Sequence, residues 1–96
     1  MYKGELIKFH PGVPGYLSPG GVHLEHFRLL ANISGIRSEK ILIALESFLV
    51  RGLTRQQSCE LAGVSPASIS VKLRQMQGVN RAVIELQPWY SLSDAD

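Results

Sequence analysis

Apolar residues recur at helical spacing along most of this chain, and no segment alternates in the manner of a strand. An apolar stripe formed by Leu24, Phe27, Leu30 and Ala31 predicts a first helix over residues 21–32, which the sequence NISG at 32–35 interrupts. Ser38 is the expected N-cap of a second helix, whose stripe runs from Ile41 to Leu49 and which Gly52 is expected to end.

Residues 54–76, TRQQSCELAGVSPASISVKLRQM, have the pattern of a helix-turn-helix. Thr54 is placed to cap a short helix, and Gly63 falls where the turn needs a positive φ. Ser65 is placed to cap a second helix that begins with Pro66, whose missing N–H does no harm at that position.

Each helix of this motif is expected to have one buried face. In the first, Cys59 and Ala62 face inward. In the second, Ile69, Leu73 and Met76 share one face. The free face carries small and polar residues that can reach DNA, namely Pro66, Ala67, Ser70 and Arg74.

After Gly78, which is expected to kink or restart the chain, residues 80–86 predict a last helix with Val79, Val83 and Leu86 facing inward. Pro88 is expected to stop it, and Trp89 and Tyr90 to fold back on the core.

The predicted fold is all-α, a small bundle of about four to five helices. Residues 1–20, with three prolines and four glycines, form an N-terminal arm, either a poorly ordered tail or a strap. Residues 21–90 form the helical domain, and residues 91–96 an acidic tail that frays.

Charge adds a functional indication to this pattern. The net charge is only +2, but basic residues concentrate around the motif, and residues 82–96 carry three acids and no base. Between residues 51 and 81 only Glu60 is acidic, whereas five residues are basic: Arg51, Arg55, Lys72, Arg74 and Arg81. Such a patch favours a polyanionic partner, with Arg55, Lys72, Arg74 and Arg81 holding the DNA backbone.

The sequence gives little indication of metal binding, catalysis or membrane insertion. His23 and His26 are three residues apart but have no second pair of ligands, so no metal site is predicted. Cys59 has no histidine near it in sequence, and neither a catalytic triad order nor a phosphate-cradling loop is present. No enzymatic activity, cofactor or small-molecule ligand is predicted. Apolar stretches fall short of a membrane span and no signal peptide is recognised, so a cytoplasmic, nucleoid-associated protein is expected.

Three segments in this order carry a family resemblance: IRSEKILIALESFLVRG (36–52), TRQQSCELAGVSPASISVKL (54–73) and NRAVIELQPWY (80–90). Over about residues 24–90 the chain resembles the PapB-type regulators of fimbrial (adhesin) operons. The resemblance implies a bacterial regulator of pilus genes that binds repeated AT-rich sites on double-stranded DNA and oligomerises along it, with either sign of regulation.

The resemblance also implies roles for particular residues. Arg55 and Cys59 match positions implicated in DNA binding, although a small buried residue at position 59 also fits an indirect role in placing the second helix. Self-association is implied for Leu29, Ser47, Phe48, Leu49 and Val50. Family members contact the minor groove, whereas a helix-turn-helix usually reads the major groove, and the sequence leaves the groove open. The alternative hypothesis is a helical protein–protein interaction module that does not bind DNA.

Overall fold

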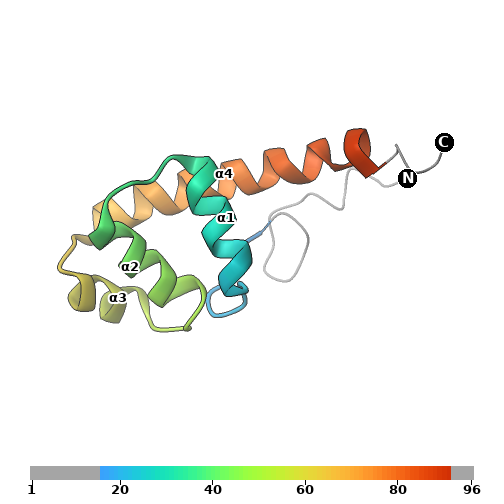
Figure 1. The fold of residues 1–96 in the computed structure, drawn as a ribbon. Coiled ribbons are helices and arrows are strands. Elements are labelled where there is room, and N and C mark those ends of the chain that lie inside the picture. Colours follow the sequence, from blue (N-terminus) through green and yellow to red (C-terminus); the bar gives the residue numbers. More distant parts are fainter. Residues whose placement is uncertain (1–15, 92–96) are drawn as a thin grey trace.

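Four helices and a short N-terminal strap make up residues 16–91, the part of the chain that this computed structural model describes (Figure 1). The helices are α1 (Leu24–Ser34), α2 (Glu39–Leu49), α3 (Arg55–Ala62) and α4 (Pro66–Ser91). The predicted all-α fold is confirmed. Most of the predicted arm and nearly all of the predicted tail lie outside the described residues.

Helix ends follow the predicted capping residues closely. The Ser38 hydroxyl accepts a hydrogen bond from the Ile41 amide at 3.3 Å and caps α2. Thr54 and Gln57 form a reciprocal capping box at the start of α3, with distances of 3.0 and 2.9 Å. Gly63 ends α3 in the left-handed conformation (φ 72°), which costs glycine little.

Because α3 has only eight residues, it depends strongly on this cap. Thr54→Ala removes the hydroxyl acceptor and is expected to lower the free energy of unfolding by about 1 kcal/mol. Urea denaturation measures the change. The matched control Ser38→Ala removes a longer cap hydrogen bond from α2, a helix with a much larger buried face, and is expected to cost no more. An unchanged urea midpoint for Thr54→Ala would show that packing alone holds α3.

Two predicted boundaries were wrong. The first helix continues through NIS to Ser34 and ends at Gly35, whose φ of 73° makes it the C-cap. The second helix ends at Leu49 with Val50 as C-cap, before Gly52. Gly52 lies instead in the loop to α3, where its positive φ of 81° favours glycine.

The core lies where α1, α2 and α3 meet the first half of α4. Fully buried side chains come from α2 (Leu45, Leu49) and from α4 (Ile69, Met76). The predicted inward faces of the first two helices and of the helix-turn-helix are confirmed, with Leu24, Leu42 and Leu73 only half-buried at their edges.

The largest departure from prediction is the length of α4. It runs without interruption from Pro66 to Ser91, through Gly78 and Pro88, and its second half extends beyond the bundle (Figure 1). Glycine in a helix costs only about 1 kcal/mol and does not break it. Pro88 lies in the last turn, where the hydrogen bond it cannot donate is lost near solvent.

Because this half of α4 leaves the bundle, several residues predicted to face inward are exposed. Val83 and Leu86 are 39% and 46% exposed, and Trp89 and Tyr90 are 76% and 71% exposed. The predicted aromatic plug was therefore wrong: the helix carries both rings away from the core. Only Val79 packs against the core, as a half-buried residue.

The strap, residues 16–22, explains why part of the predicted arm belongs to the domain. Leu17 and Val22 are buried, and the Gly20 and Val22 amides donate to the carbonyls of Phe48 and Leu49 at 3.1 Å each. Near its start, the Leu17 backbone is bound by the Gln77 side chain of α4, 60 residues away. The strap therefore ties the end of α2 to the middle of α4.

Candidate nucleic-acid interface

The turn between α3 and α4 has the geometry that the helix-turn-helix pattern predicts. The Ser65 hydroxyl accepts from the Ser68 amide at 3.1 Å, and the Ser65 carbonyl accepts from the Ile69 amide at 3.3 Å. Pro66 is the first residue of α4. Ile69 is fully buried beneath the turn, so the opposite face of α4 is left to solvent.

We call this outward surface the recognition face. Pro66, Ala67 and Arg74 are exposed, and Ser70 is half-buried between them. At 3.6 residues per turn, the four residues lie within about 100° of one another around the helix. The structure thus brings together the groove-facing residues predicted from sequence: Pro66, Ala67, Ser70 and Arg74.

Arg55 joins this face through contacts that sequence did not indicate. Its guanidinium donates to the Ser70 hydroxyl at 2.8 Å and lies over the Phe48 ring, 5.3 Å from the ring centroid. The side chain remains exposed and positively charged beside α4. These contacts hold Arg55 in a fixed position, so that little conformational entropy is lost if it binds a phosphate.

Cys59 is a free cysteine and is 5% exposed, as expected for the small residue where α3 packs against its neighbours. Ser58 beside it is fully buried. With so little exposed surface, Cys59 offers DNA almost nothing to contact directly. Its position suits the indirect role, in which the residue sets the distance of α3 from the core.

The other two predicted basic contacts lie on different sides of α4. Lys72 is half-buried and, two residues from Arg74, lies about 160° from it around the helix. It lines a hollow with Ile41 of α2, and Ala67 at the edge of the recognition face lines the same hollow. Arg81, seven residues after Arg74, returns to the same side and lies 3.5 Å from Glu85 in an exposed ion pair.

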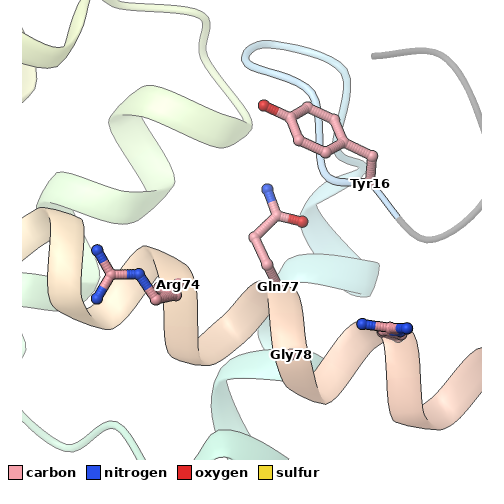
Figure 2. A pocket seen from close by; sticks show the side chains of 5 residues that line it. Tyr16, Arg74, Gln77 and Gly78 are labelled. Atoms are coloured by element: carbon pink, nitrogen blue, oxygen red, sulfur yellow. The ribbon is translucent and has the colours of Figure 1, made fainter. Parts of the chain in front are cut away.

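A pocket that sequence reasoning missed lies farther along this side of α4. Its volume is about 260 Å³. We call it the strap pocket, and Figure 2 shows the residues that line it: Tyr16, Arg74, Gln77, Gly78 and Arg81. Leu17 N–H donates to Gln77 Oε1 at 3.0 Å and Gln77 Nε2 donates to the Leu17 carbonyl at 3.1 Å, which fixes Tyr16 over the helix. Because the two partners are 60 residues apart, nothing in the sequence pairs them.

The residues for which the resemblance implies self-association fall into a buried group and a more exposed group. Ser47, Phe48 and Leu49 are buried in the protein's own core, and the Ser47 hydroxyl donates to the Ile43 carbonyl at 2.8 Å. Because these three side chains are covered within a single subunit, the self-association that the resemblance implies for them stays a prediction. Leu29 is 60% exposed on α1 and Val50 is half-buried.

The described residues offer little for metal or membrane chemistry. Between residues 16 and 91 no three His, Cys, Asp or Glu side chains gather in a way that could hold an ion. His23 instead caps α1, with its Nδ1 accepting from the Glu25 amide at 3.2 Å. No helix in the same range is long and apolar enough to cross a bilayer.

Comparison with known proteins adds to this geometry. Residues 9–90 match the PapB family, described as adhesin biosynthesis transcription regulatory protein. The AFA-III adhesin operon regulatory protein of Escherichia coli is 41% identical over 76 residues, which cover 79% of this chain and 75% of that protein. The F1845 adhesin operon regulatory protein of the same organism is 42% identical over 71 residues, covering 74% of this chain and 84% of its own length.

A solved structure has the same fold. The crystal structure of Escherichia coli FocB superposes with a TM-score of 0.72 at 34% identity, covering 77% of this chain and 84% of that chain. The similarity therefore extends over most of the described helices.

Proposed function

The chain belongs to the PapB family of adhesin biosynthesis transcription regulatory proteins, and we propose that it acts by binding double-stranded DNA through α3 and the first half of α4. The family is one of transcription regulators and not of enzymes. We propose that this activity takes place in the cytoplasm, on the nucleoid. Its DNA-binding domain comprises residues 21–90 together with the strap.

The observation that supports this proposal most is the continuity of the recognition face with a basic side of α4. Small exposed residues at the start of α4 allow close approach to base edges. Arg55 on one side and Arg74 farther along can then bind the phosphates that border the groove. Cys59 contributes by holding α3 at the correct distance.

Repeated AT-rich sites are the expected target, as the family resemblance implies. A domain of this size makes few base contacts, so useful affinity requires several copies on neighbouring sites. Positive side chains near the DNA also favour AT-rich segments, since their narrow minor groove has an enhanced negative potential.

Fluorescence anisotropy tests the proposal with the full chain and two labelled duplexes, one with phased AT-rich repeats and one GC-rich, across a salt series. Tight, cooperative binding that weakens with salt and prefers the AT-rich repeats is the expected result. Failure to bind either duplex at low salt would contradict it, and the motif would then be a protein-binding hairpin.

For self-association we propose the outer half of α4 as the contact with a second copy. Val83, Leu86 and Tyr90 are exposed at spacings of three and four, which places them on one side of the helix. We call these three residues the distal stripe. Covering Tyr90 and the adjacent Trp89 alone removes on the order of 300 Å² from water, a sizeable part of the roughly 800 Å² that each partner buries in a stable complex. Leu29 on α1 supplies a further exposed apolar residue.

Leu86→Glu is expected to shift the protein toward the monomer in sedimentation velocity, because it places a charge within the apolar contact. Leu61→Glu is the matched control: Leu61 is 58% exposed on α3, away from the distal stripe. Its sedimentation is expected to equal that of the unaltered protein. Equal sedimentation of all three proteins, with the unaltered protein associated, would exclude the distal stripe as the interface.

A further inference from the structure

Arg55 occupies a position that its own helix does not favour. It is the first residue of α3, where the helix dipole makes a positive charge unfavourable. The first turns of α1 and α2 instead carry Glu25 and Glu39. Among residues 16–91, no carboxylate lies within ion-pair distance of the Arg55 guanidinium. Its charge therefore stabilises neither the helix nor a local ion pair, and it stays available to a partner.

Two side chains from other helices hold this guanidinium in place. Phe48 lies in the last turn of α2 and is 9% exposed, and the guanidinium carbon of Arg55 lies 5.3 Å from the centroid of its ring. A guanidinium over an aromatic face at that distance makes a cation–π contact. Ser70, on the recognition face, accepts a hydrogen bond from Arg55 Nη1 at 2.8 Å. An arginine side chain otherwise samples many rotamers, so these two contacts determine where its charge lies.

These contacts fix the position of the charge without cancelling it. An aromatic ring and a hydroxyl are both neutral, whereas a carboxylate would neutralise the guanidinium. One N–H group of Arg55 is given to Ser70, and the remaining ones can bind the oxygens of a phosphate. Because Ser70 belongs to α4, the same hydrogen bond sets the position of Arg55 relative to the recognition face. A phosphate bound by Arg55 would therefore fix the register of α4 on the duplex.

We propose that Phe48 is a positioning residue of the DNA interface, whose ring holds Arg55 where it binds a backbone phosphate beside the recognition face. α2 then takes part in DNA binding without touching DNA, since the Phe48 ring lies beneath the Arg55 guanidinium. This role differs from the self-association that the family resemblance implies for Phe48. It requires that changes at Phe48 reach DNA only through Arg55. The inference rests on the proposed DNA binding.

A double-mutant cycle tests this role, with affinity for the AT-rich duplex measured by fluorescence anisotropy. Phe48→Leu keeps an apolar side chain in the core but removes the ring, and is expected to weaken binding about threefold. Arg55→Ala removes the phosphate contact itself and is expected to weaken binding about tenfold. Adding Phe48→Leu to Arg55→Ala is expected to weaken binding no further, because the side chain that the ring positions is already gone.

Three further variants separate positioning from folding. Phe48→Leu leaves a small cavity, so its melting temperature is expected to fall by a few degrees. Phe27→Leu is the matched control, because Phe27 is 3% exposed in the same core but belongs to α1. It is expected to lower the melting temperature as well and to leave DNA affinity unchanged. Phe48→Tyr keeps the ring and is expected to bind within about twofold of the unaltered protein. Arg55→Lys leaves the core untouched and keeps the charge but not the planar group, and is expected to weaken binding about threefold.

Several results would overturn this role for Phe48. Equal weakening by Phe48→Leu in the presence and absence of the Arg55 side chain would mean that Phe48 acts through the fold. An Arg55→Lys variant that binds as tightly as the unaltered protein would mean that a charge alone suffices. Loss of self-association by Phe48→Leu in sedimentation velocity without DNA would place Phe48 at a subunit contact instead. In each case DNA binding by the unaltered protein still stands, whereas its absence would reject the proposed function and this inference with it.

Discussion

Replacing Leu45 with alanine is expected to lower the free energy of unfolding by about 2–5 kcal/mol. Leu45 is fully buried in the middle of α2, the helix that packs against the other three. The shorter side chain leaves a cavity that the surrounding side chains of the core cluster can only partly fill. Domains of this size are stable by only about 5–15 kcal/mol, so the substitution removes a large share of the total.

Urea denaturation followed by circular dichroism measures this change. Ile43→Ala is the matched control, because Ile43 lies on the same helix, has a side chain of the same size and is 46% exposed. Its expected cost is below about 1 kcal/mol, since much of the side chain is already in water. Equal costs for the two variants would mean that the α2 faces are assigned incorrectly.

The features predicted correctly from sequence are those that depend on local chemistry. Ser38 and Thr54 each begin a helix because their hydroxyls accept hydrogen bonds from nearby amides. Gly63 ends α3 because the turn needs a left-handed residue. These interactions span three or four residues, so the sequence contains both partners side by side. The buried stripes of α2 and of the motif follow from spacing in the same way.

The outer half of α4 was predicted incorrectly because its environment is not encoded locally. Val83 and Leu86 have the spacing of a buried face, and the pattern alone cannot say whether a core is there to receive it. Gly78 and Pro88 are helix-breaking residues on average, yet each is tolerated where it stands, Gly78 in an unobstructed helix interior and Pro88 in a last turn beside solvent. An apolar face left open in this way is the kind of surface a second subunit covers.

Contacts between distant segments account for the rest of the site. Neither the bond from Arg55 to Ser70 nor the clamp of Gln77 on Leu17 follows from any sequence pattern, because the partners are 15 and 60 residues apart. Both act on the same side of α4. One fixes a cation beside the recognition face, and the other brings Tyr16 to the strap pocket.

Arg74 belongs to both the recognition face and the strap pocket, so it connects these two regions of α4. Arg74→Ala is therefore expected to weaken DNA binding by about tenfold or more and to lower the salt slope by about 1. As a phosphate contact carries no sequence information, the loss should be similar on AT-rich and GC-rich duplexes. Arg74 is exposed, so the urea midpoint should stay nearly unchanged. Anisotropy across a salt series measures the affinity and the slope together.

Lys72→Ala is the matched control for this prediction. It removes the same charge from the same helix only two residues away, but from a half-buried side chain that lies about 160° around the helix from Arg74 and lines a hollow with Ile41 of α2. If only a general attraction between a basic protein and DNA were at work, the two variants would lose the same DNA affinity, because at long range only the total charge matters. A defined interface makes the loss of DNA affinity much larger for Arg74→Ala than for Lys72→Ala. Equal losses would contradict the recognition face, whereas a larger loss for Lys72→Ala would place the DNA on the opposite side of α4.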